Sequence, residues 1–118
     1  MKIWLSDELG RGFLGDGRYR LLREISRQGS LQKAAFELGI SYRKAWGDIR
    51  AMEGKLGFEI VHRQRGGTGG GTSVLTDQGR ELLEAFGRIQ SKVQNQAKKI
   101  FNFELKNAIL IQPKKTRK

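Results

Sequence analysis

The chain has 118 residues, of which 37% are hydrophobic and 30% charged, a composition that indicates one small globular domain. Its 23 Lys and Arg residues outnumber its 12 Asp and Glu residues, and the formal net charge of +11 favours a polyanionic partner, such as nucleic acid or an acidic membrane surface. Cysteine is absent, no apolar run is long enough to cross a bilayer and the N-terminus lacks a signal peptide's apolar core, so we expect a cytoplasmic protein without disulfides, cysteine metal sites or membrane-spanning helices.

The first part of the chain predicts a short strand followed by a helix. Residues 2–9 alternate loosely between apolar and polar side chains, which favours a strand, and the four glycines of residues 10–17 predict an irregular connection. Residues 17–28 then predict a helix capped by Asp16, with apolar residues on one face and four arginines on the other. We expect this helix to support the elements that follow.

Residues 30–56 predict two short helices joined by a tight turn. Each helix follows a serine that can cap it, and apolar residues recur in each at three- and four-residue steps. Gly39 ends the first helix, because glycine reaches the left-handed conformation without a Cβ penalty. Ala35 is small where the helices cross, and Ala45 is an apolar anchor for the second helix. This spacing is typical of a helix-turn-helix.

The opposite face of the second helix is polar and mostly cationic, as in a helix that lies in a DNA major groove. Arg43 and Lys44 lie in its first turn and can donate to O6 and N7 of guanine, while Gly47 permits close approach. Tyr42 can contact a phosphate or a thymine methyl group. The alternative is a solvated face with no DNA contact. The candidate DNA-binding residues of this helix are Ser41, Tyr42, Arg43, Lys44, Gly47 and Arg50.

After residue 57 the periodicity changes to that of short strands. Apolar residues at 58, 60, 61, 74 and 75 flank a basic, glycine-rich loop, which predicts a β-hairpin wing. We assign Arg63 and Arg65 to DNA phosphates beside the wing, with Lys33 on the first helix of the pair as a weaker phosphate contact.

Nothing in the chain indicates catalysis. The glycine-rich loop lacks the glycine–lysine pair that enters a helix in phosphate-binding loops. No Ser/His/Asp or Cys/His set can be assembled, and His62, the only histidine, cannot form a histidine metal cluster. We therefore expect no enzyme activity, catalytic residue, metal, cofactor or small-molecule site. Trp46 is expected in the core.

From residue 77 a long amphipathic helix is predicted, with Thr76 as its N-cap. An apolar stripe on so long a helix must be covered by a second copy or a partner, so we expect a homodimer formed by residues 77–106. Residues 1–106 would form the domain, and residues 107–118 a disordered basic tail. The candidate dimerisation residues are Leu82, Phe86, Ile89, Val93 and Ile100.

The order of these elements resembles the N-terminal domain of LysR-type regulators. The phrase at residues 56–63, followed by Val-Leu-Thr at 74–76 and by Gly79, is similar to that group's wing and linker helix. Gly-Ile-Ser-Tyr at 39–42, with the glycine-rich loop, resembles the DNA-binding domain of molybdate-responsive ModE regulators. The resemblance covers about residues 19–100.

The resemblance implies a mainly α fold with a small β wing, a winged helix-turn-helix with a long C-terminal dimerisation helix. It implies a sequence-specific transcriptional regulator that binds a pseudo-palindromic operator in double-stranded DNA as a homodimer, with no membrane partner. Family members commonly have lysine where Thr68 stands, and no molybdate-binding domain follows residue 118, so we do not expect direct molybdate sensing. The alternatives are a non-specific architectural DNA-binding protein and a protein-interaction module on the same fold.

Overall fold

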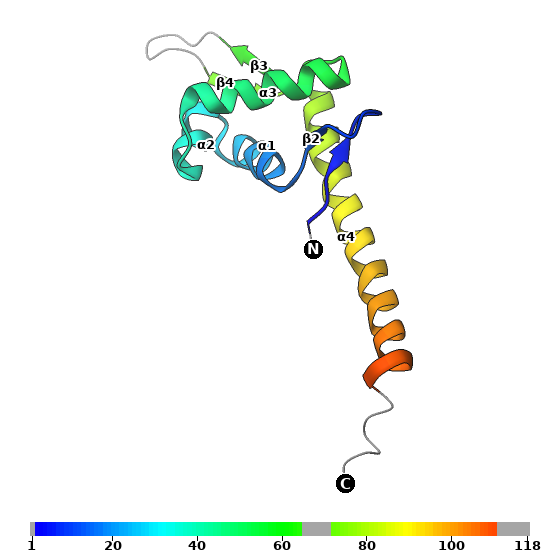
Figure 1. Cartoon of the computed structure of the whole chain (residues 1–118). Coiled ribbons are helices and arrows are strands. Elements are labelled where there is room, and N and C mark those ends of the chain that lie inside the picture. The colour runs from blue at the N-terminus through cyan, green and yellow to red at the C-terminus, as the bar shows by residue number, and fades with distance from the viewer. Residues whose placement is uncertain (1, 65–71, 111–118) are drawn as a thin grey trace. The chain divides into compact units, whose positions relative to one another are not determined.

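The structure is a computed structural model that describes residues 2–64 and 72–110 (Figure 1). It divides into two compact units, residues 2–86 and the chain from residue 87 onward, which we describe separately. The elements are β1 (Leu5–Ser6), β2 (Gly12–Leu14), α1 (Asp16–Gln28), α2 (Leu31–Leu38), α3 (Tyr42–Leu56), β3 (Val61–Gln64), β4 (Thr72–Leu75), α4 (Asp77–Leu105) and a π-helix, η1 (Lys106–Leu110). The mainly α fold with a small β wing is confirmed.

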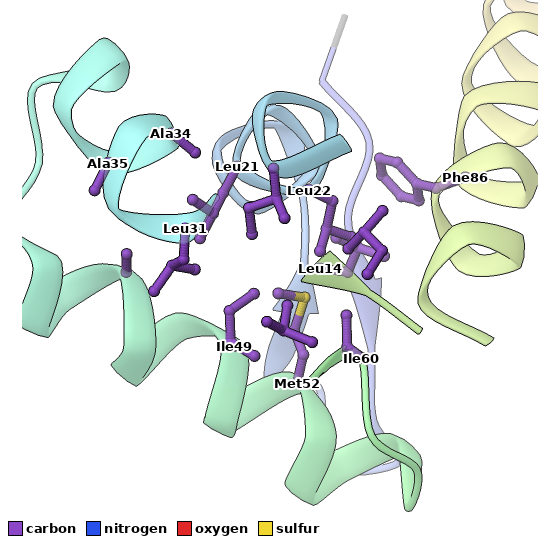
Figure 2. Packing of buried hydrophobic residues seen from close by; sticks show 14 residues of the cluster. Leu14, Leu21, Leu22, Leu31, Ala34, Ala35, Ile49, Met52, Ile60 and Phe86 are labelled. Atoms are coloured by element: carbon purple, nitrogen blue, oxygen red, sulfur yellow. The ribbon is translucent and has the colours of Figure 1, made fainter. Parts of the chain in front are cut away.

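The core of the first unit lies between α1, α2, α3 and the start of α4 (Figure 2). Ala35 and Ala45 are buried, so the two short helices of the predicted helix-turn-helix carry small side chains inside the core. The predicted apolar stripes of α1, α2 and α3 all face inward. The largest fully buried side chains are Leu14, Leu21, Leu22, Ile25, Leu31, Ile49, Met52, Ile60 and Phe86.

The ends of α2 and the start of α3 make the local interactions that their sequence predicts. Ser30 Oγ accepts a hydrogen bond from the Lys33 amide at 3.2 Å, and Ser41 Oγ accepts one from the Lys44 amide at 3.0 Å. Gly39 ends α2 with φ of 71°, in the left-handed region. The two helices are thus bounded by local interactions.

The N-terminal segment differs from the prediction. Only residues 5–6 of the expected strand form a strand, β1, and residues 12–14 of the expected irregular connection pair with them as β2. Asp7 Oδ1 accepts from the amides of Leu9 and Arg11, both at 2.9 Å, and so shapes the turn between the strands. Asp16 is not the cap of α1 but its first residue, and it pairs with Arg20 at 2.8 Å.

The wing begins later than its apolar residues predict. The carboxylate of Glu53 accepts hydrogen bonds from the amides of Ile60 and Val61, at 2.8 and 3.3 Å, and anchors the connection that precedes β3. Strand pairing therefore starts at Val61, opposite Leu75, and runs antiparallel to Gln64, opposite Thr72. Phe58 and Ile60, expected in the strand, lie in that connection.

In the second unit α4 continues to Leu105, and η1 extends the helical structure to Leu110. Residues 107–110 of the predicted tail are therefore helical, and residues 111–118 lie outside the described residues. Thr76 caps α4 as predicted, because its Oγ1 accepts from the Gly79 amide at 2.9 Å. No helix in the part of the chain that the structure describes has the length and apolar character to span a bilayer.

Candidate nucleic-acid interface

The second helix of the pair, α3, separates buried and exposed side chains by face. Ala45, Ile49 and Met52 are fully buried in the first unit, while the candidate residues from Ser41 to Lys44, with Gly47 and Arg50, are exposed. This division follows from the helical period, because residues three and four apart share a face. The predicted cationic side of α3 is therefore exposed and not packed into the core of its own unit.

The outer face of α3, which we define as Arg43, Gly47, Arg50 and Gly54, has no side chain at two of its four positions. A Cβ atom built at Gly47 or at Gly54 would meet no heavy atom within 4 Å. Sequence reasoning identified Gly47 but missed Gly54, although the spacing of seven residues between them places both on one side of the helix. The two glycines let a flat or convex partner approach the helix backbone closely.

The two cations of the first turn of α3 have different surroundings. Lys44 Nζ lies 3.2 Å from Asp48 Oδ2, and Asp48 Oδ1 also accepts from Arg18 Nη2 at 3.2 Å. Arg18 in turn donates to the carbonyl of Phe13 at 2.9 Å, which ties the pair to the body of the unit. Within the described residues, the side chain of Arg43 makes no hydrogen bond or ion pair. Arg43 is therefore the unengaged cation of the first turn. Sequence reasoning missed this distinction, although the residue four positions after Lys44 is Asp48 and the one four positions after Arg43 is Gly47.

The side chain of Arg63, on the first strand of the wing, β3, reaches the N-terminal half of α3. Arg63 Nη2 donates to the hydroxyl of Tyr42 at 3.3 Å. The guanidinium carbon of Arg63 also lies 5.0 Å from the ring centroid of Trp46, and that of Arg50 lies 5.1 Å from it. Three predicted contact residues from two elements thus gather around one indole ring. Trp46 itself is only partly buried, with one part of its surface against the core.

The remaining candidates are placed as follows. Lys33, on α2, lines a hollow of about 850 Å³ together with Ser30, Gln32 and Thr72 of β4. His62 is exposed, and its Nδ1 lies 3.5 Å from the carboxylate of Glu59. Arg65 lies outside the described residues.

The candidate dimerisation residues divide into two groups. Phe86 is fully buried in the core of the first unit, where its ring centroid lies 5.3 Å from that of Tyr19, and Leu82 packs against the same core. The expectation that Phe86 faces a second copy is therefore wrong, because an internal contact covers it. The sequence stripe continues without a break from the core-facing part of α4 to its later part, so periodicity alone could not separate the two.

Beyond Ile89 most of the large apolar side chains of α4 are open to solvent. Ile89 is half-buried, whereas Val93 is 41% exposed and Ile100 60% exposed. Phe101 and Phe103, each 63% exposed, were not singled out in the sequence, although Phe101 lies four residues after Ala97 and Phe103 lies three after Ile100. In the second unit, a hollow of about 460 Å³ is lined by Gln94, Ala97, Lys98 and Phe101.

Comparison with known proteins places the chain among regulators. Residues 17–80, more than half of the chain, match the family described as bacterial regulatory helix-turn-helix protein, lysR family. This matched range contains α1 from its second residue onward, α2, α3 and both strands of the wing.

Three curated relatives show the same likeness. The molybdenum-pterin-binding protein MopB of Rhodobacter capsulatus is 41% identical over 91 residues, which are 77% of this chain and 33% of MopB. The molybdenum transport protein ModE of Azotobacter vinelandii is 37% identical over 82 residues, 70% of this chain and 30% of that protein. The DNA-binding transcriptional dual regulator ModE of Escherichia coli K12 is 37% identical over 83 residues, which are 68% of this chain and 32% of that protein.

The chain therefore spans about a third of the length of the curated relatives it matches. The match lies in the part that carries the helix-turn-helix and the wing, and the family is one of regulators, not of enzymes. With α2, α3 and the wing in place, the chain belongs to the lysR family of bacterial regulatory helix-turn-helix proteins, and it carries the DNA-binding domain of a ModE-type regulator.

Proposed function

We propose that the chain binds a pseudo-palindromic operator in duplex DNA as a homodimer and regulates transcription in the cytoplasm. The observation that carries this proposal is the open outer face of α3, with an unengaged Arg43 in its first turn and the wing residue Arg63 beside it. A helix with this profile fits the major groove, and a cation beside it fits the flanking phosphates.

The surroundings of each cation suggest different roles. Arg43 is free to donate two hydrogen bonds to O6 and N7 of a guanine, so we assign base reading to it. Lys44 must leave Asp48 or share it in order to reach DNA, so we assign it to a phosphate at most. Arg50, Arg63 and Lys33 also contact phosphates in this proposal, and Ser41 and Tyr42 add neutral contacts at the start of α3.

A second copy of the chain is the proposed cover for the apolar face of the second unit. Val93 and Ile100 lie seven residues apart on α4 and are both exposed, with Ala97 between them. An unpaired helix with such a stripe buries it against another helix. A two-fold dimer would present two copies of α3 about one helical turn of DNA apart, or a multiple of it, which explains the expected symmetry of the operator.

The genes under control are proposed to concern molybdenum. The support is the printed descriptions of the relatives, which include a molybdenum transport protein and a molybdenum-pterin-binding protein. Among residues 2–64 and 72–110, no group of three or more His, Cys, Asp or Glu side chains is arranged to hold a metal ion.

In vitro selection of bound duplexes with the purified chain tests this function. We expect an enriched motif with two half-sites related by inverted symmetry, bound about 10³-fold or more tighter than random duplex at the same salt concentration. Equal affinity for selected and random duplexes would favour a non-specific architectural protein, driven by the net charge of +11. Failure to bind any duplex at low salt would favour a protein-interaction module.

A further inference from the structure

The ring of Trp46 makes contacts with polar side chains that a tryptophan needed only for core packing does not require. Its ring carries the guanidinium groups of Arg50 and Arg63 at 5.1 and 5.0 Å, one from its own helix and one from β3. Tyr42 meets the same ring edge-on, with centroids 6.4 Å apart and an interplanar angle of 85°. Tyr42 also accepts the hydrogen bond from Arg63, so the four side chains form one connected cluster.

The indole nitrogen of Trp46 shows that hydrogen bonding does not explain this residue. Nε1 is buried, and among the described residues it has no hydrogen-bond partner. A buried donor without an acceptor lowers stability, and leucine or phenylalanine would supply an apolar side chain without such a donor. The property that indole has and leucine lacks is an electron-rich face, which attracts a guanidinium more strongly than any other side-chain ring does.

The ring also reduces the conformational entropy that two long cationic side chains lose on binding. An arginine in water samples many rotamers, and fixing it against a phosphate costs conformational entropy. A guanidinium that already lies over a ring has lost part of that freedom before DNA arrives. Arg50 and Arg63 are 13 positions apart in the chain, yet both guanidinium groups lie over the ring of Trp46.

We propose that Trp46 is a positioning residue for DNA binding, which acts by placing Arg50 and Arg63 over its ring so that the wing contact and the α3 contact are set together. The inference rests on the proposed function and adds to it a residue that touches no DNA. This role differs from simple core packing, in which Trp46 would stabilise the fold and the position of the two arginines would not depend on it.

A double-mutant cycle on DNA affinity tests the proposal. We expect Arg63→Ala to weaken binding of the selected duplex by about tenfold in the wild-type chain, but by about twofold or less in a Trp46→Leu background. Core packing alone predicts the same factor in both backgrounds. Arg43→Ala is the matched control, because Arg43 does not lie over the ring, and its cost should be equal in the two backgrounds.

The Trp46→Phe variant extends the cycle if leucine impairs folding, which thermal unfolding would report. Phenylalanine keeps an aromatic face that binds cations less well than indole, so we expect the cost of Arg63→Ala in this background to lie between the two values. A cost of Arg63→Ala that is unchanged in both the leucine and the phenylalanine backgrounds would overturn the proposal.

A spectroscopic measurement tests the same contacts without DNA. The chain has two tryptophans, so Trp4→Phe leaves Trp46 as the only indole emitter. In that background we expect Arg63→Ala and Arg50→Ala each to shift Trp46 emission to longer wavelength, as water replaces a guanidinium, and Arg43→Ala to leave it unchanged. Unshifted emission in both variants would refute the arrangement.

The outcomes separate the two proposals. If the wild-type chain binds no duplex, the proposed function fails and the positioning role fails with it. If the wild-type chain binds its selected duplex but the cycle is additive, the positioning role alone fails.

Discussion

The carbonyl oxygen of Ile60 occupies the space into which a side chain at Gly79 would project. The first turn of α4 thereby packs directly against the backbone that leads into the wing. Thr76 adds two hydrogen bonds to this junction between α4 and the segment before β3. Its amide donates to the Ile60 carbonyl at 2.9 Å, and its hydroxyl donates to the Glu59 carbonyl at 2.6 Å. The close approach fixes the start of α4 against the wing within the first unit.

Gly79→Ala is therefore expected to destabilise the chain even though alanine favours helices. The methyl group meets rigid backbone, and such overpacking costs about 1–3 kcal/mol. Chemical denaturation would measure the loss. Gln78→Ala, at the neighbouring exposed position of the same turn, is the control and should change the unfolding free energy little. A Gly79→Ala variant as stable as the wild type would show that the junction can open without cost.

Gly47→Ala should have the opposite effect on stability and should weaken DNA binding. The added methyl group meets nothing within 4 Å, so the gain in helix propensity of about 0.5–1 kcal/mol should appear as increased stability. The same methyl group protrudes from the outer face of α3 and should reduce affinity for the selected duplex. Denaturation and fluorescence anisotropy measure the two effects. Increased stability with unchanged affinity would place Gly47 outside the DNA interface.

The ion pair between Asp7 and Lys55 predicts a specific pH dependence. Asp7 Oδ2 accepts from Lys55 Nζ at 2.6 Å, and this bond, with those from Arg11, holds the pKa of the Asp7 carboxyl well below its usual range. Because the pKa is lower in the folded chain, the stabilisation is present above the unfolded-state pKa of about 3.9 and is lost as the pH falls toward the folded value.

Asp7→Asn should therefore be less stable than the wild type at neutral pH, and the difference should shrink as the pH is lowered below about 4. Unfolding free energies of both chains across this range measure it. A difference that stays constant down to pH 2 would mean that the hydrogen bonds to the Leu9 and Arg11 amides, and not the charge on Asp7, account for its contribution.

The apolar face of the second unit leads to a prediction about assembly. Ile100→Glu places a charge on the exposed stripe and should shift the chain from dimer to monomer, because burying an unpaired carboxylate is costly. Asn95→Glu adds the same charge at an exposed position away from Val93, Ala97 and Ile100, and should leave the dimer intact. Sedimentation velocity over a range of concentrations distinguishes the two states. A wild-type chain that is monomeric at all concentrations would contradict the proposed dimer.

The sequence predicted those parts of the fold that short-range interactions determine. Ser30, Gly39 and Ser41 set the bounds of the helix-turn-helix through contacts within four residues, and all three behave as predicted. The strand β2 was missed, because the turn before it depends on Asp7 accepting from two amides, and no periodicity reveals that arrangement.

The candidate site shows the same limit. The exposed side of α3 followed from helical period, and the pair of Lys44 with Asp48 spans only four positions, whereas the hydrogen bond between Arg18 and Asp48 spans 30. Phe86 continues the stripe of α4 in sequence, but Tyr19 of α1 covers it. Contacts between residues far apart in the chain decide such cases.

The central claim is that the outer face of α3 reads DNA bases through Arg43. Fluorescence anisotropy, at one salt concentration, of the wild type and of Arg43→Ala on the selected duplex and on a scrambled duplex tests it most directly. We predict that Arg43→Ala loses about 1–3 kcal/mol of discrimination between the duplexes while its affinity for the scrambled one changes little, and that Lys44→Ala keeps the discrimination. Equal weakening on both duplexes in Arg43→Ala would contradict the claim and make Arg43 a phosphate contact.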